Sequence, residues 1–260
     1  MTRQVSALIA TVVVVGAAAI PLAGCGGGGS SRSDPAAAID ALRASVPLRV
    51  RLKSASKPVR GPSYPLATVR PGQTIALHDA PGGRVVDRVG ARTEFGSMRV
   101  FWIEKVRGDW FGVPVPELPD RRLSWIRHDP VSLELSQTRF WVTADVSEQR
   151  LELHYGNRVL DSFPVSVGSS SSPTPLGDYA VTDGLVGKGL GPWYGCCVLA
   201  LSGHQPNLPA GWIGGNRMAI HGTPGSVGGA TSHGCLRASD HDMISLFARV
   251  PLGAPVFIRA

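Results

Sequence analysis

The sequence predicts a mainly β protein: a small N-terminal barrel, a larger C-terminal sheet and one short helix near the end. Gly (32) and Pro (21) together supply 53 of the 260 residues, and they separate short apolar runs as turns separate strands. Several of these runs alternate apolar and polar residues, which is the strand period. The apolar spacing of an amphipathic helix follows residue 239. This length suffices for one large or two modest domains.

The positive charge lies in the first half of the chain. Lys and Arg number 26 against 19 Asp and Glu, a net charge of +7. Residues 1–130 hold 18 basic and 10 acidic residues, and residues 131–260 hold 8 and 9. A basic half attracts nucleic acid, an anionic lipid surface or an anionic wall polymer. Charge alone does not choose among these partners.

The N-terminus has the pattern of an export signal. Arg3 precedes an uncharged run from Val5 to Gly24, and Leu-Ala-Gly-Cys closes it at Cys25. The segment 1–25 resembles a bacterial lipoprotein signal, which implies lipidation of Cys25 and attachment to the outer face of the membrane. An uncleaved transmembrane anchor is the alternative that we favour less. Both place the remainder in the periplasm or cell wall, which argues against nucleic acid as a partner.

Two segments follow before the C-terminal half. Residues 26–65 are expected to be a flexible tether and linker, with a short helix at 36–45. Residues 66–130 are expected to form a small β domain, and its Gly-Asp-Trp-Phe-Gly-Val and Leu-Ser-Trp-Ile-Arg segments resemble bacterial SH3-like domains. We favour core packing for Trp110 and Trp125 over a place on a binding face. The expected strands are 74–78, 84–89, 99–106, 110–115 and 124–127.

The second domain, residues 138–260, begins as an antiparallel meander. A Gly-Asn turn at 156–157 joins two runs that alternate apolar and polar residues. A rigid Pro-Thr-Pro-Leu-Gly turn covers 173–177. The Gly- and Trp-containing stretch 187–215 is either a loop over a cleft or an aromatic packing segment. The expected strands are 140–146, 150–155, 159–167, 179–181, 198–201 and 218–220.

The segment 219–237 carries the chemistry. It reads A-I-H-G-T-P-G-S-V-G-G-A-T-S-H-G-C-L-R. An exported thiol tends to be oxidised, so an unpaired Cys235 in a Gly-rich loop indicates a nucleophile. Ser239 and Asp242 form a capping-box-like pair that starts a helix, and its N-terminus is expected to favour the thiolate.

The base that Cys235 needs is assigned by spacing. His221 lies across a loop that folds back, whereas His233 is two residues away and points oppositely on an extended segment. No Asp or Glu lies between residues 183 and 240, so the Gly222 carbonyl is expected to orient the imidazole. The N–H groups of His233, Gly234 and Cys235 are expected to form an oxyanion nest.

These motifs together resemble the catalytic domain of the YkuD-type L,D-transpeptidases. The likeness rests on H-G-T, S-H-G-C-L-R, the following helix and V-P-L-G-A-P-V-F-I, and it covers roughly residues 140–260. It implies a β-sandwich, peptidoglycan stem peptides as substrate and a thioester on Cys235, with His221 as base. It also implies 3→3 crosslinks and carbapenem inhibition. Ser232, Thr223 and Arg237 become candidate substrate-binding residues, with Arg237 facing a substrate carboxylate.

Other interpretations remain beside this one. Water as acceptor gives an L,D-carboxypeptidase, a protein as acceptor gives wall attachment, and a vestigial site leaves a wall-binding lipoprotein. A buried structural thiol and a zinc site of His221, His233 and Cys235 are less favoured, and no cofactor or metal is expected. The adjacent pair Cys196 and Cys197 has no assigned role, and a bridge between neighbours is strained.

Overall fold

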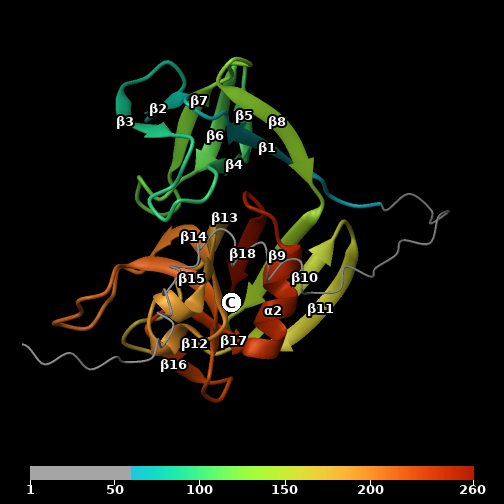
Figure 1. Ribbon diagram of the computed structural model, residues 1–260, viewed down its shortest axis with the longest axis vertical. Helices are drawn as coiled ribbons and strands as arrows, with labels where there is room; N and C mark the ends of the chain where they lie inside the picture. The colour runs from blue at the N-terminus through green and yellow to red at the C-terminus, as the bar shows by residue number, and fades with distance from the viewer. Residues whose placement is uncertain (1–59) are drawn as a thin grey trace, which may run out of the picture. The chain divides into compact units, whose positions relative to one another are not determined.

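The computed structural model describes residues 60–260 and is mainly β with one α-helix in that range (Figure 1). This confirms the predicted fold class. The predicted signal, Cys25, the tether and the helix at 36–45 lie outside the described residues. Among residues 60–260, no helix is long and apolar enough to cross a membrane.

The N-terminal part folds into two small antiparallel sheets around one core. Predicted strand 99–106 is wrong as a single element, since it splits into two short strands on either side of residues 103–104. Two strands had no prediction, β1 (Tyr64–Val69) and β8 (Leu133–Thr138), and they pair with each other. The first sheet has the order β3 (Val85–Gly90), β2 (Thr74–His78), β7 (Leu123–Arg127), β6 (Trp110–Pro114) and β5 (Lys105–Arg107), and the second has β4 (Val100–Trp102), β1 (Tyr64–Val69) and β8 (Leu133–Thr138).

Turn chemistry explains the hairpin of this part. Gly108 has φ +56 between β5 and β6, a conformation that glycine adopts without steric cost. Trp125 is buried, as the core-packing interpretation predicts, and Trp110 is half-buried against the ring of His78.

The C-terminal part contains an eight-stranded mixed sheet. The meander was predicted correctly, with the turn at Gly156 in a left-handed conformation. Predicted strand 159–167 ends earlier, at Pro164, and a separate two-stranded ladder of β12 (Val167–Gly168) and β16 (Ala230–Ser232) follows. The sheet order is β11 (Arg158–Pro164), β10 (Arg150–Tyr155), β9 (Phe140–Asp145), β18 (Pro255–Arg259), β13 (Gly177–Val186), β14 (Cys197–His204), β15 (Arg217–Thr223) and β17 (Leu236–Ser239).

Helix α2 (Asp240–Arg249) follows β17 directly and packs its apolar face into the sheet's core. Ser239 caps it by accepting from the Asp242 N–H at 3.1 Å, as the sequence predicts. Met243, Leu246 and Phe247 are buried, whereas Ile244 is 37% exposed. The capped helix therefore holds β17, the strand that follows Cys235, in place at its C-terminal end.

An apolar cluster joins the two parts. Leu66 and Trp102 of the N-terminal sheets pack with Ala180 of β13, and Phe257 of β18 lies against them. The ring centroids of Trp102 and Phe257 are 5.6 Å apart in an edge-to-face arrangement, a favourable geometry for aromatic pairs. The residues on this face of the C-terminal sheet are thus covered by the N-terminal part.

Candidate active site

Two adjacent parallel strands bring the predicted nucleophile and base together. β15 carries His221, and β17, which begins directly after Cys235, pairs beside it with Arg237 opposite His221. Cys235 and His221 both line one cavity of about 350 Å³. Its lining also includes Trp193, Tyr194, Gln205, Leu208, Trp212, Gly215, Asn216, Arg217, Thr231, Ser232, His233 and Arg237.

The cysteine loop, residues 232–235, is held by its own first side chain. The Ser232 hydroxyl donates to the Cys235 carbonyl oxygen at 2.6 Å and accepts from the Gly234 N–H at 3.0 Å. Gly234 has φ +114, and a Cβ there would lie 2.0 Å from Nε2 of Gln205. The loop therefore requires glycine at 234 on both conformational and steric grounds.

A second layer, absent from the sequence prediction, supports this loop. The Thr174 hydroxyl donates to the Gly234 carbonyl at 2.9 Å and accepts from the Gly168 N–H at 2.8 Å. The Gln205 amide donates to the Pro173 carbonyl at 2.9 Å. Thr174 belongs to the predicted 173–177 turn, which was the available signal, whereas nothing local to Gln205 marks it.

The surroundings of the Cys235 thiol favour its protonated form. Burial raises its pKa, and the Ala219 N–H and the Arg237 guanidinium oppose that shift without overcoming it. Sγ lies 4.0 Å from the Arg217 carbonyl oxygen, the acceptor for the thiol proton. The predicted thiolate, stabilised by the helix N-terminus, is therefore wrong for the resting state, because desolvation outweighs the positive groups nearby.

The His221 imidazole is neutral and oriented. Nδ1 lies 2.7 Å from the Gly222 carbonyl oxygen, the contact that the sequence predicts. A carbonyl only accepts, so Nδ1 carries the proton and Nε2 is left with a free lone pair. Burial lowers the pKa of His221 to about 4, with Arg237 adding to the shift. The ring also contacts Tyr194, with centroids 5.0 Å apart.

Asp240 lies beside Gly222, and its charge acts on the His221 imidazole. Its Oδ1 accepts from the Cys196 N–H at 2.9 Å, and its charge opposes the lowering of the His221 pKa. A Cβ on Gly222 would lie 2.2 Å from the same oxygen. Cys196 and Cys197 are both free thiols, half-buried and buried. Asp240 escaped sequence reasoning because its approach to Gly222 depends on how β17 pairs with β15.

The predicted substrate-binding residues separate into two groups. Ser232 and Arg237 line the cavity, and the Arg237 guanidinium donates to the Thr231 carbonyl oxygen. His233 is exposed at the rim against Trp212, with ring centroids 5.0 Å apart. Thr223 lies outside the lining, where its hydroxyl accepts from the Gly225 N–H at 3.2 Å.

The expected oxyanion nest needs a correction. The Gly234 N–H already donates to Ser232, so it does not point at a substrate. The N–H groups of His233 and Cys235 remain as candidates. Within residues 60–260, no group of three His, Cys, Asp or Glu residues is arranged to hold a metal ion.

Comparison with known proteins places this site in a family. The family model described as the L,D-transpeptidase catalytic domain, YkuD, matches residues 139–258. The Bacillus subtilis protein YqjB, which carries the L,D-transpeptidase name, is 30% identical over 129 residues, covering 45% of this chain and 70% of YqjB. The chain belongs to the YkuD family.

The chain is also similar to a second curated protein and to solved structures. YkuD of Bacillus subtilis is 31% identical over 121 residues, which are 46% of this chain and 65% of YkuD. The matched part thus spans slightly less than two thirds of that relative. Among solved structures, an L,D-transpeptidase from Mycobacterium smegmatis is 17% identical, with a TM-score of 0.38, over 62% of this chain and 89% of its own. L,D-transpeptidase 3 from Mycobacterium tuberculosis, solved with a faropenem-derived adduct, is 17% identical, with a TM-score of 0.37, over 53% and 73%.

Proposed function

We propose that this YkuD-family protein is a peptidoglycan L,D-transpeptidase that forms 3→3 crosslinks through a thioester on Cys235. The observation that carries the proposal is a thiol and a neutral, oriented imidazole lining one cavity. A thiol that must lose its proton as it attacks needs a base, and we assign that role to the free Nε2 of His221, because His221 lines the same cavity.

The first half-reaction transfers the stem peptide to the enzyme. Sγ of Cys235 attacks the carbonyl of the third stem residue, while the thiol proton passes to Nε2 of His221. The bond to the terminal D-alanine then breaks, and His221 returns the proton to the leaving amine. A thioester and free D-alanine result, with the imidazole neutral again.

The second half-reaction depends on the acceptor. The side-chain amine of a neighbouring stem attacks the thioester, loses a proton through His221 to the departing thiolate, and leaves a 3→3 amide. Water in place of the amine gives an L,D-carboxypeptidase, and a protein amine gives wall attachment. The same acyl-enzyme serves all three reactions, so product analysis distinguishes them.

The charge of the cavity fits an anionic stem peptide. Arg237 has no carboxylate partner among residues 60–260, and its contact there is the Thr231 carbonyl. A guanidinium without a counter-ion in a half-enclosed cavity attracts a substrate carboxylate. The N–H groups of His233 and Cys235 are the donors that we assign to the developing oxyanion.

We place the protein outside the cytoplasm, anchored by lipid on Cys25 and acting on the cell wall. The uncharged run that ends at Cys25 supports this location. The basic first half is suited to anionic wall polymers. A wall-binding role of the N-terminal part, with its resemblance to SH3-like domains, belongs to the same proposal.

We also expect carbapenems to acylate Cys235. A β-lactam carbonyl presents the same electrophile as the stem peptide, and the solved L,D-transpeptidase LdtMt1 is in complex with the carbapenem imipenem. Such an adduct blocks the thiol and stops crosslinking.

The test is incubation of the purified protein with a stem tetrapeptide, followed by mass analysis of protein and products. We expect release of D-alanine, an acyl adduct and a crosslinked dimer. Cys235→Ala is expected to abolish all three, whereas Cys196→Ala, which removes the neighbouring thiol, retains them. Equal turnover by Cys235→Ala and the unmodified protein would refute the assigned nucleophile.

A further inference from the structure

A tight loop of the N-terminal part reaches the catalytic sheet beside the active site. We call residues 91–98 the Glu94 loop. Its backbone is closed by a bond from the Thr93 N–H to the Ser97 carbonyl at 2.9 Å and another from the Gly96 N–H to the Thr93 carbonyl at 3.0 Å. The Arg92 guanidinium adds a third bond, to the Gly96 carbonyl at 2.6 Å. The loop is therefore held in one shape before it meets its partner.

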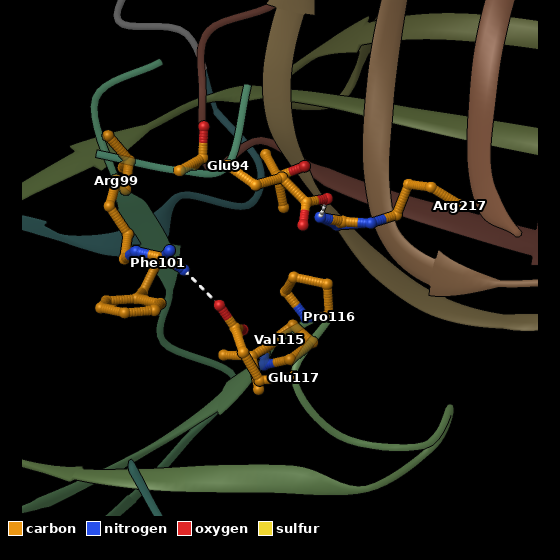
Figure 2. A pocket seen from close by; sticks show the side chains of 11 residues that line it. Glu94, Arg99, Phe101, Val115, Pro116, Glu117 and Arg217 are labelled. Atoms are coloured by element: carbon orange, nitrogen blue, oxygen red, sulfur yellow. Dashed lines mark hydrogen bonds and ion pairs between the residues drawn. The ribbon is translucent and has the colours of Figure 1, made fainter. Parts of the chain in front are cut away.

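The partner is Arg217, the first residue of β15. One of its Nη2–H groups donates to Oε1 of Glu94 at 2.7 Å, and Nη1 donates to the Leu201 carbonyl at 3.1 Å. The side chain is 12% exposed, and its guanidinium lies 5.8 Å from the centre of the Phe95 ring. Glu94 and Arg217 also line a small pocket that is separate from the active-site cavity. Figure 2 shows the Glu94 carboxylate and the Arg217 guanidinium meeting there.

The sheet is irregular where Arg217 binds. Ala200 of β14 pairs with Ala219, and His204 pairs with Arg217, so four steps along β14 face two along β15. A regular ladder does not run through this interval, and the start of β15 is less firmly held there. The Arg217 side chain links the two strands there, because its guanidinium donates to the Leu201 carbonyl oxygen across the irregular stretch.

The same residue borders the reacting sulfur. The Arg217 carbonyl oxygen accepts from the Cys235 thiol, at 4.0 Å from Sγ. Arg217 and His221 lie four residues apart on β15, hence on one face, and both residues line the active-site cavity. A shift of β15 at Arg217 therefore moves the thiol's acceptor and the base's strand together.

A second contact fixes the loop to the sheet independently. The Thr93 hydroxyl donates to Oδ1 of Asp183 on β13, and Asp183 is fully buried. β13 and β15 flank β14 on its two sides. The Glu94 loop thus contacts the catalytic sheet on both sides of the irregular strand.

We propose that Glu94 is a positioning residue for the reaction at Cys235. It acts through Arg217, whose backbone and side chain set the start of β15 against the cysteine loop. The inference rests on the proposed function, since Cys235 is taken as the reacting atom. It makes the N-terminal part a component of the active site rather than an appended module.

The test measures the thiol itself. The full protein and Glu94→Ala are alkylated with iodoacetamide across a range of pH, and modification of Cys235 is followed by peptide mass. Glu134→Ala is the matched control, because Glu134 pairs with Arg70 at 3.2 Å wholly within the N-terminal part. We expect Glu94→Ala to alter the alkylation rate of Cys235 about fivefold, equivalent to about 1 kcal/mol at 1.36 kcal/mol per decade, with Glu134→Ala unchanged.

The rescue variant separates positioning from general stability. Glu94→Gln keeps an oxygen that accepts from Arg217, so its alkylation rate is expected to lie within about twofold of the unmodified protein. Glu94→Ala that lowers the melting temperature but leaves Cys235 reactivity and its pH profile unchanged would overturn the proposal. Failure of Glu94→Gln to recover the rate would overturn it as well.

The two proposals fail differently. Alkylation needs no peptide substrate, so a Glu94 effect on Cys235 without any tetrapeptide adduct would leave the positioning intact and reject the transpeptidase. A tetrapeptide adduct that forms equally fast in Glu94→Ala and the unmodified protein, with equal alkylation, would reject the positioning alone.

Discussion

At the scale of residues, the active site is a neutral pair rather than an ion pair. Burial raises the pKa of Cys235 and lowers the pKa of His221 to about 4, so both shifts disfavour charge. A half-buried thiol and a buried imidazole, both neutral, carry no separated charges. In the proposed reaction, proton transfer accompanies attack on the substrate, and His221 stays unprotonated well below neutral pH.

The lowered pKa of His221 makes stability depend on pH. Because the unfolded imidazole binds a proton near its ordinary pKa of about 6.5 and the folded one does not, the His221 contribution is present above that value and is lost as pH falls towards 4. We expect this contribution to fall by about 2 kcal/mol between pH 7 and pH 5. Urea denaturation at the two pH values measures it.

His221→Gln is the control for that measurement, because glutamine does not titrate. Its free energy of unfolding is expected to change less between pH 7 and pH 5 than that of the unmodified protein. An equal pH dependence in both proteins would show that His221 titrates normally in the folded state.

Sequence reasoning marked residues that line the candidate site and missed those that support them. Cys235, His221 and the Gly222 carbonyl lie within one segment, so their spacing was informative. Thr174, Gln205 and Asp240 act through contacts that tertiary packing creates, and no local pattern marks them. The thiolate prediction was wrong because a sequence shows a helix start but not the desolvation of the sulfur beside it.

At the scale of elements, the cysteine loop depends on the Thr174 hydroxyl. Thr174→Val keeps the shape but removes both bonds and leaves the Gly168 N–H and the Gly234 carbonyl unpaired. We expect a loss of about 1–3 kcal/mol in the free energy of unfolding, together with slower acylation of Cys235. Denaturant titration and adduct formation over time measure the two effects.

Thr174→Ser retains the hydroxyl and is expected to keep acylation close to that of the unmodified protein. If Thr174→Val acylates as fast as Thr174→Ser, the hydroxyl does not hold the loop.

Local signals predicted the hairpins, and long-range pairing escaped them. The Gly108 and Gly156 turns gave the hairpins around β5–β6 and β10–β11, since both strands are adjacent in sequence. β17 and β18 form parallel pairs with β15 and β9, distant along the chain, and neither strand was predicted. β1 and β8 pair across more than sixty residues for the same reason.

At the scale of the whole described chain, Trp102 is part of the apolar cluster that joins the two parts. Trp102 is buried at their junction among Leu66, Ala180 and Phe257. Trp102→Ala leaves a large cavity there and is expected to cost about 3–5 kcal/mol. We expect the unmodified protein to unfold in a single calorimetric transition. We expect Trp102→Ala to unfold at lower temperature, with separate transitions for the two parts.

Trp193→Ala is the control, since Trp193 is 76% exposed and its loss is expected to change stability by about 0.5 kcal/mol or less. Two separate transitions in the unmodified protein, unaffected by Trp102→Ala, would show that the junction does not couple the parts.

The most direct test of the central claim is the mass of the Cys235 peptide after brief exposure to a stem tetrapeptide. We expect an acyl group on the Cys235 sulfur, a thioester that hydroxylamine removes, and no such group on Cys196. An unmodified Cys235 while D-alanine is released, or an adduct on another residue, would contradict it.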